Sequence, residues 1–355
     1  MTNKNPAVNL HVLDAFLFFV PVSILFYYLK VDYLLVFLST AAALAGITHL
    51  LAESTAVIAS KVSTTISALL NATFGNAIEF AVAYFSLKAG LVELVKASIT
   101  GSIILNVLFL IGLAMVAGGL KYKEQKFNKE SAGLASTMLI IAVVGLALPS
   151  LYQMVVGKPA ASMSIAVSII LGIIYLLSLL YTLGTHKHLF TVERQPPDEN
   201  PGRWSTRMAV IVLILATGVV GFESNVLVST IQPIMSNTGI SQTFVGLIFI
   251  AVLTNIPEMV SAMTFARRNH MTLSLEIGMS SALQMALFVV PILVVISSAF
   301  VGGSLNLVFG PFEIAAVLVT AMIANYIGSD GICHWLEGAQ LIAVYLLIGV
   351  AFYFL

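Results

Sequence analysis

The sequence has 355 residues, of which 59% are hydrophobic and only 9% are charged, against about 25% charged residues in an average soluble protein. Its 16 Lys and Arg balance 16 Asp and Glu, so net charge suggests neither nucleic acid nor an acidic partner. The one cysteine, Cys333, excludes an internal disulfide and a cysteine metal cluster. The composition predicts an all-α polytopic membrane protein, with the lipid bilayer as its surroundings.

Eleven runs of apolar residues are long enough to cross a bilayer, because a transmembrane helix needs about 20 such residues. The first run follows one lysine, and no clear small-residue cleavage site comes after it, which predicts a retained helix. The third and eighth runs contain polar clusters, and the tenth carries Glu313. In chain order the runs lie near residues 12–29, 33–51, 64–87, 91–118, 133–151, 162–183, 206–222, 243–266, 272–299, 311–328 and 336–355.

Lysine and arginine gather in alternate connections between these runs, as the positive-inside rule expects. Twelve of the 16 basic residues fall on one predicted side, and the other four are Lys30, Lys88, Lys96 and Lys158. This asymmetry predicts a cytoplasmic N-terminus, and eleven spans then put the C-terminus outside. We expect a multi-pass protein of a prokaryotic cell membrane.

Only one connection is long and polar, residues 184–207, with "THKHLF" and "RQPPDENPGR". Its prolines and charges, and its lack of apolar periodicity, predict a flexible cytoplasmic linker. The linker separates a first group of five helices, 33–183, from a second group, 208–355, and residues 1–32 form an extra N-terminal transmembrane helix.

The same polar phrase returns on both sides of the linker. "GNAIEF" at 75–80 and "TNIPEM" at 254–259 align Asn76 with Asn255 and Glu79 with Glu258. Within each phrase the amide and the carboxylate are three residues apart, which places them on one face of a helix.

A second polar pair follows in the next span of each half. It is Ser102 and Asn106 in "GSIILN", and Ser280 and Gln284 in "SSALQ". Four polar positions in the same order predict an internal repeat, and since each half has five spans, the second copy enters the membrane inverted. The predicted fold is therefore eleven transmembrane helices, one extra N-terminal helix plus two inverted five-helix repeats.

Inverted repeats build many secondary transporters, whose sites lie near the midplane where broken helices meet. At 1.5 Å per residue, Glu79 and Glu258 fall within roughly 5 Å of that plane. Pro257 lacks the donor for the carbonyl of Leu253 and clashes with it, and Gly75 acts in the same way more weakly. We expect carbonyls freed near Gly75 and Thr254 to serve as ligands.

A carboxylate at this depth costs at least about 2.5 to 3.5 kcal/mol. Two opposed ones are tolerated when a cation neutralises them or when they are protonated. Because these states exclude each other, one set of ligands that binds either a cation or protons is an exchange mechanism. Oxygens from Glu, Asn, Gln, Ser and backbone suit a hard ion such as calcium, while the absence of His and Cys at this depth argues against zinc or copper.

The phrases "GNAIEF", "GSIILN", "FVGLIFIAVLTNIPE" and "SSALQMALFVVP" resemble the calcium/proton exchanger (cation/proton antiporter) family of the calcium/cation antiporter superfamily. The resemblance covers nearly the whole chain. It implies that Ca²⁺ is the transported substrate rather than a cofactor, that protons move the other way, and that Glu79 and Glu258 bind both. Asn76, Asn255, Asn106 and Gln284 would line the same cavity, with Ser102 and Ser280 beside them.

Two features depart from that family. Thr254 and Pro257 stand where it usually has a GNAAE-like string, which is closer to the SLPE-like string of sodium/calcium exchangers. Those relatives, however, commonly carry an acid where this chain has Asn106 or Gln284, so proton coupling is preferred. The family's long acidic stretch between the halves is reduced here to Glu193, Asp198 and Glu199.

Alternative interpretations stay open for several residues and for the function. Glu53 and Glu223 are candidates for the proton route or are interfacial, and Asn106 and Gln284 could instead join helices by hydrogen bonds. Acids near span ends are expected to face headgroups or water: Glu276, Glu313, Asp330 and Glu337. The competing functions are sodium/calcium exchange and an intramembrane hydrolase with two carboxyls as acid and base. Oligomeric state, and calcium against manganese as cargo, are not predicted.

Overall fold

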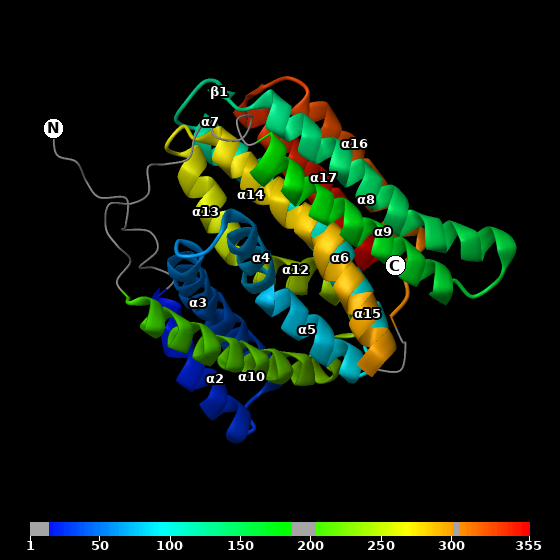
Figure 1. Ribbon diagram of the computed structural model, residues 1–355. Helices are drawn as coiled ribbons and strands as arrows, with labels where there is room; N and C mark the ends of the chain where they lie inside the picture. Colours follow the sequence, from blue (N-terminus) through cyan, green and yellow to red (C-terminus); the bar gives the residue numbers. More distant parts are fainter. Residues whose placement is uncertain (1–13, 187–203, 301–304) are drawn as a thin grey trace. The chain divides into compact units, whose positions relative to one another are not determined.

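A computed structural model describes residues 14–186, 204–300 and 305–355, and these residues are almost entirely helical (Figure 1). Within that part, eight helices are long and apolar enough to cross a membrane, or ten if each of two bent helix pairs is one span. The first predicted span is represented by a shorter apolar helix, Phe16–Tyr28. The prediction of eleven spans thus depends on counting this short helix with the ten. The predicted linker lies mostly outside the described residues.

The chain divides into two compact units, each containing parts of both predicted repeats. Unit 1 comprises residues 1–89 and 196–240. Its helices are η2 (Phe16–Phe18), α2 (Phe19–Tyr28), α3 (Tyr33–Ala59), α4 (Thr64–Gly75), α5 (Ala77–Lys88) and α10 (Thr206–Thr238).

Unit 2 comprises residues 90–195 and 241–355. Its first elements are α6 (Val92–Ile104), η3 (Leu105–Leu110), α7 (Ile111–Gly119), β1 (Gln125–Lys126), α8 (Lys129–Val156), α9 (Ala161–Leu180) and η4 (Tyr181–Thr185). After the linker come α11 (Gln242–Phe244), η6 (Val245–Ile250), α12 (Ala251–Thr254), α13 (Ile256–Ala266), α14 (Met271–Gln284), η7 (Met285–Val289), α15 (Val290–Phe300), α16 (Pro311–Gly328), β2 (Ile332–Cys333) and α17 (Trp335–Tyr353).

In unit 1 the long helix α10 packs along α3 and also contacts α5, while α2 packs on α3. Helix α3 begins at Asp32, whose side chain accepts a hydrogen bond from the backbone N–H of Leu34 at 2.9 Å, a favourable N-cap. Gly46 lets η2 approach closely, since a Cβ there would lie 2.7 Å from the backbone nitrogen of Leu17.

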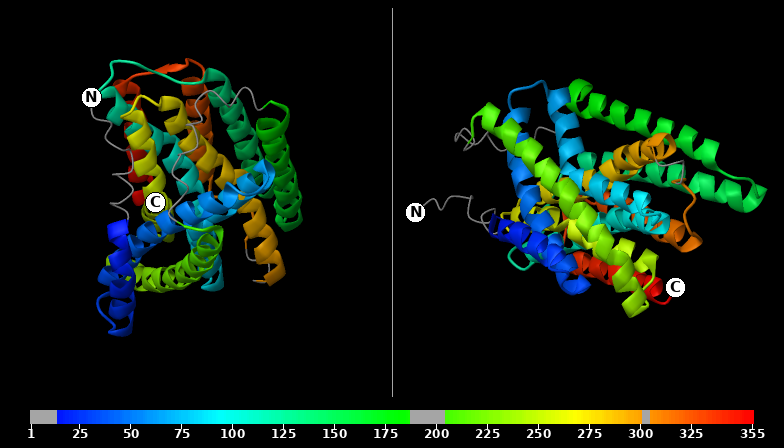
Figure 2. Two further views of the ribbon diagram at one scale, coloured as in Figure 1. Left: turned by 60° about the vertical axis from the view of Figure 1, so that its left-hand side comes forward. Right: turned by 90° about the horizontal axis from the view of Figure 1, so that it is seen from below.

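Glycines also bring helices of unit 2 into close contact. A Cβ on Gly101 of α6 would lie 2.6 Å from the Cα of Leu247, and one on Gly246 would lie 2.6 Å from the carbonyl oxygen of Leu94. Each glycine therefore admits the backbone of the other segment. The hairpin of α8 and α9 runs beside α14 (Figure 2). Its outer face leaves large apolar side chains exposed, including Ile170 and Leu176 of α9, as expected of a surface that faces lipid.

One end of unit 2 gathers basic connections that the positive-inside rule predicts to share a side of the membrane. Strands β1 and β2 pair antiparallel there, with Gln125 opposite Cys333. The side-chain amide of Gln125 donates to the carbonyl of Ala266 at 2.8 Å, and Lys121 Nζ donates to that of Arg267 at 3.2 Å. These two short strands are the only β-structure in the described part of the chain, which is nearly, though not wholly, helical. We call this the basic end of unit 2.

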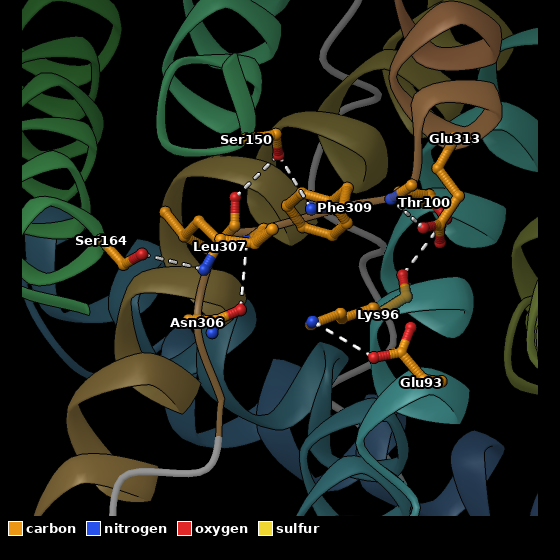
Figure 3. A network of polar contacts seen from close by, with 11 residues as sticks. Glu93, Lys96, Thr100, Ser150, Ser164, Asn306, Leu307, Phe309 and Glu313 are labelled. Carbon is orange, nitrogen blue, oxygen red and sulfur yellow. Dashed lines mark hydrogen bonds and ion pairs between the residues drawn. The ribbon is translucent and has the colours of Figure 1, made fainter. Parts of the chain in front are cut away.

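At the opposite end, polar side chains fix the segment that leads into α16 (Figure 3). The Ser150 hydroxyl donates to the Leu307 carbonyl at 3.2 Å and accepts from the Phe309 N–H at 2.8 Å. Glu313 accepts from the Gly310 N–H at 2.8 Å and from the Thr100 hydroxyl at 3.2 Å, and it is only 4% exposed. The prediction that Glu313 faces headgroups or water is wrong, because this carboxylate caps the start of α16 inside the protein.

Candidate functional site

The polar phrase of unit 1 forms a break between two helices. Residues Ile66–Gly75 and Ala77–Lys88 meet at an angle of 51°. Asn76 lies at the break with φ −109° and ψ 21°, and its side-chain Nδ2 donates to the Ala72 carbonyl at 2.7 Å. In an uninterrupted helix this carbonyl would accept the backbone N–H of residue 76, so the side chain replaces a bond that the bend removes.

Unit 2 repeats this geometry. Gln242–Thr254 and Ile256–Ala266 meet at 56°, and Asn255 lies between them with φ −109° and ψ 12°. Its Nδ2 donates to the Ala251 carbonyl at 2.8 Å. Both breaks fall within the predicted phrases. The residue common to them is asparagine, whereas the sequence interpretation gave this role to Gly75 and Pro257.

The structure explains why neither Gly75 nor Pro257 is the common cause. Gly75 is the last residue of α4, and a Cβ there would meet nothing within 4 Å. Pro257 is the second residue of α13, where the first-turn N–H groups have no partner in the helix, so proline costs little.

Each glutamate occupies the first turn of the helix that starts after the break: Glu79 in α5 and Glu258 in α13. The N-terminus of a helix carries unpaired N–H groups and the positive end of the dipole, which stabilise a negative charge. Glu79 is 7% exposed. The Oε2 atom of Glu258 is buried and has no hydrogen-bond partner among the described residues.

Four side chains of unit 2 form a hydrogen-bonded cluster around Asn255. Asn106 Nδ2 donates to Asn255 Oδ1 at 2.8 Å and to Ser281 Oγ at 2.9 Å. Asn255 Nδ2 is 3.4 Å from Ser102 Oγ and 3.1 Å from the hydroxyl of Thr254. The side-chain oxygen of Asn106, Oδ1, is buried with no partner in the described structure. A buried oxygen without a donor is costly, and a bound cation would satisfy it.

Apart from Glu258, the predicted site residues of unit 2 therefore divide into two groups. Asn106, Asn255, Ser102 and Thr254 meet in the cluster. Ser280 is exposed and donates to the Ile277 carbonyl of its own helix at 3.2 Å, and both Ser280 and Gln284 line a cavity beside α8 and α9.

Ser281 is a member of the cluster that the sequence interpretation missed. The signal was present, because Asn76 to Asn255 and Glu79 to Glu258 are both shifts of 179 residues, and the same shift takes Ser102 to Ser281. The sequence interpretation chose Ser280 instead, because Ser280 is four residues before the amide of Gln284, just as Ser102 is four residues before Asn106.

The two proton-route candidates both lie in unit 1. Glu53 Oε2 is 4.0 Å from His49 Nε2, which also lies 3.3 Å from Asp14 Oδ1. Glu223 of α10 is fully buried, and its Oε1 accepts from the Ser23 hydroxyl of α2 at 2.8 Å. Its Oε2 is buried without a partner in the described part of the chain. An interfacial position, the alternative considered for Glu223, does not fit this burial.

Comparison with known proteins shows the family to which this chain belongs. The family described as sodium/calcium exchanger protein matches residues 32–184 and 208–354, on both sides of the linker. The chain belongs to this family. Among curated relatives, the Ca²⁺/H⁺ antiporter of Aphanothece halophytica is 38% identical, over 100% of this chain and 98% of its own length. The Ca²⁺/H⁺ antiporter ChaA of Bacillus subtilis is 38% identical over 90% of this chain and 91% of its own.

A solved structure, that of native YfkE, has the same fold as this chain. Native YfkE superposes with a TM-score of 0.83 at 33% identity, covering 98% of this chain and 99% of its own. The two matched segments begin and end close to the predicted five-helix groups, 33–183 and 208–355. The resemblance to calcium/proton exchangers in the sequence motifs is therefore confirmed.

Proposed function

We propose that this chain is a secondary active antiporter that exchanges Ca²⁺ for H⁺ across a membrane by alternating access. Its family membership supports transport rather than hydrolysis, and full-length relatives at 38% identity are Ca²⁺/H⁺ antiporters. The single observation that carries the proposal is the buried, unpartnered Oε2 of Glu258, one helical turn beyond the Asn255 cluster.

Glu258 and Glu79 are the groups that bind either cargo. In the cation-bound state both are ionised, and the N–H groups of α13 and α5 help to stabilise their charge. In the proton-bound state both are neutral, which removes the cost of carboxylates at membrane depth. We propose that the two glutamates oppose each other near the midplane, as the inverted repeat predicts.

Calcium takes six to eight oxygen ligands, and the cluster in unit 2 supplies several. Besides Glu258, it offers the free Oδ1 of Asn106, the hydroxyls of Ser102 and Ser281, and the Thr254 segment at the helix break. Asn76, with the backbone beside Gly75, would contribute the equivalent oxygens from unit 1. Ser280 and Gln284 contact the cation on its way to these ligands.

Coupling follows because one ligand set cannot hold both cargoes. Protonation removes the charge that attracts Ca²⁺, and bound Ca²⁺ favours the ionised carboxylates. Two protons neutralise the pair as one divalent cation does, so we propose at least two H⁺ per Ca²⁺.

The predicted inverted repeat, 33–183 and 208–355, is part of this proposal. It is supported by two breaks with the same asparagine geometry and by π-helices that begin at Leu105 and Met285, close to Asn106 and Gln284. π-Helical turns are frequent at functional sites. In alternating access, the broken helices would change between an arrangement that opens the site to one side of the membrane and one that opens it to the other. We propose that this takes place in a cell membrane, with the N-terminus on the cytoplasmic side.

Glu53 and Glu223 are proposed as stations for protons in unit 1. Oε2 of Glu223, which has no partner among the described residues, could bind a proton, while Oε1 of the same carboxyl accepts from the hydroxyl of Ser23. Glu53 has His49 within reach as a second titrating group.

The decisive experiment is Ca²⁺ uptake into proteoliposomes driven by a proton gradient, with Glu79→Gln and Glu258→Gln. Each variant keeps the size of the side chain and removes its titration, and we expect each to abolish uptake. Glu130→Gln is the control, because Glu130 is exposed at the start of α8 and should retain full uptake. Normal uptake by both glutamate variants would contradict the proposal.

The same vesicles separate proton from sodium coupling. A proton gradient without sodium should drive uptake, whereas a sodium gradient at equal pH on both sides should not. Sodium-driven uptake alone would assign the chain to sodium/calcium exchange instead.

A further inference from the structure

Unit 2 contains a cavity of about 450 Å³ between α8, α9, α13 and α14. All its walls belong to this unit, and α14 runs beside α8 in two views (Figures 1 and 2). Much of the lining is apolar, with Leu134, Met138 and Leu179 among it. This volume is large enough for several water molecules.

One wall of the cavity is a polar stripe on α14. Thr272, Glu276, Ser280 and Gln284 all line it, and each follows the last by four residues. With 3.6 residues per turn and 1.5 Å per residue, four such positions share one helix face over about 18 Å. A helix that met only lipid here would not carry a carboxylate and three other polar groups in register.

The stripe joins the basic end of unit 2 to the level of the asparagine cluster. Thr272 accepts a hydrogen bond from the N–H of Asn128 at 3.2 Å, close to the Arg267 connection. Gln284 ends α14 three residues after Ser281, which belongs to the cluster. The cavity therefore reaches from the basic end of unit 2, predicted to be cytoplasmic, to the level of the asparagine cluster along α14, although Asn106, Asn255 and Ser281 do not line it.

Glu276 stands in the middle of this path with a partner on the opposite wall. Its Oε1 accepts from the Ser131 hydroxyl of α8 at 3.1 Å. A carboxylate and a hydroxyl held together across a cavity provide oxygen ligands of the kind that a hydrated calcium ion uses. The sequence interpretation expected Glu276 to face headgroups or water.

We propose that this cavity is a water-filled access path for the divalent cation, and that Glu276 with Ser131 is an intermediate binding station on it. The identity of the cargo rests on the proposed antiport, but the path itself does not. Glu276 acts before the final ligands, so its removal should weaken capture from one side and leave the transport step intact.

The first test measures water access by cysteine modification. Cys333, the one native cysteine, is 2% exposed, and burial, with a smaller effect of Glu337, raises its thiol pKa to about 12; it is replaced by alanine. Thr272→Cys and Ser280→Cys are then treated in vesicles with a charged, membrane-impermeant thiol reagent from either side. Ile173→Cys is the control, because Ile173 is 51% exposed on α9 and outside the cavity lining.

We expect both cavity cysteines to react from the basic end only and Ile173→Cys to stay unmodified. Calcium should slow the modification of Ser280→Cys. Modification of Thr272→Cys alone would mean that the inner cavity is closed or filled by a lipid chain, and this would overturn the proposal. Equal reaction of both positions from the other side would overturn it too.

The second test measures Ca²⁺ capture by Glu276→Gln in oriented vesicles. The half-saturating Ca²⁺ concentration at the basic end should rise about five-fold, the loss expected for one partly exposed charge contact. The maximal rate with Ca²⁺ supplied at the basic end should stay unchanged, and Glu276→Asp should restore capture. An unaltered half-saturation in Glu276→Gln would refute the station.

Failure of the path and failure of the antiport are distinguishable. If Glu258→Gln abolishes exchange while Ser280→Cys is inaccessible, the path is wrong and the antiport stands. If the cysteines react as expected but the parent protein shows no proton-driven Ca²⁺ uptake, the antiport is wrong, and the station for its cargo is overturned with it while the water path stands.

Discussion

The bent pair α4–α5 and the bent pair α12–α13 reach nearly the same geometry from different sequences. Their angles are 51° and 56°, and both asparagines have φ −109°. One pair has glycine before the break and no proline, while the other has threonine before it and proline two residues after it. The difference teaches that asparagine makes the break, because in each pair its side chain takes the carbonyl four residues back.

The largest expected effect comes from replacing those asparagines. Asn255→Ala leaves the Ala251 carbonyl without its donor and removes the acceptor for Asn106. Unmet buried hydrogen bonds cost about 1 to 3 kcal/mol each, so we expect Ca²⁺ uptake to fall by at least about ten-fold. Asn76→Ala should cause a similar loss if the two breaks are equivalent.

Uptake assays on both variants, with protein amount and thermal stability measured in parallel, check this. A strong effect of Asn255→Ala with no effect of Asn76→Ala would break the equivalence of the two pairs.

The next effect concerns the packing of glycines. Gly101→Ala should destabilise the protein by about 1 to 3 kcal/mol, because the new Cβ would lie 2.6 Å from the Cα of Leu247. Gly75→Ala is the matched control, since a Cβ there meets open space. Thermal unfolding in detergent should show a lower midpoint for Gly101→Ala only. Equal midpoints for the two variants would contradict the close contact of α6 with η6.

A smaller effect is expected at the neighbouring serines of α14. Ser281→Ala removes a hydroxyl that accepts from Asn106 at 2.9 Å, and such a bond contributes about 1 kcal/mol. The affinity for Ca²⁺ should fall about five-fold. Ser280→Ala removes only a bond within its own helix and should change equilibrium affinity less. Calcium titration of purified protein compares them, and the reverse order would exclude Ser281 from the ligands.

The smallest effect is expected for Pro257→Ala. Proline lies at the second position of α13, where its missing N–H is no loss. Transport should stay within about two-fold of the parent, and stability should change by less than about 1 kcal/mol. A large loss of uptake would indicate that proline, rather than asparagine, causes the break in this helix pair.

Sequence could predict much of this arrangement, for reasons that are local. The Asn–Glu phrases located both breaks, because a carboxylate inside an apolar span is costly and therefore marks a functional position. The glycine or proline beside each phrase indicated an interrupted helix. Composition and charge predicted the membrane class and grouped the basic connections that meet at one end of unit 2.

What sequence could not predict depends on contacts between distant residues. Glu313 looked interfacial because it begins a helix, but Thr100, more than 200 positions away, covers it. Ser281 and Ser280 are equally polar, and only the rotation of α14 decides which of them meets Asn106. The opposition of Glu79 and Glu258 stays a prediction.

The central claim is that protons and calcium compete for one pair of carboxylates. It is tested most directly by titrating purified protein with Ca²⁺ in weak buffer and counting the protons released. We expect about two protons per bound Ca²⁺, and none from the Glu79→Gln, Glu258→Gln double variant. Calcium binding by the parent protein without proton release would contradict the account.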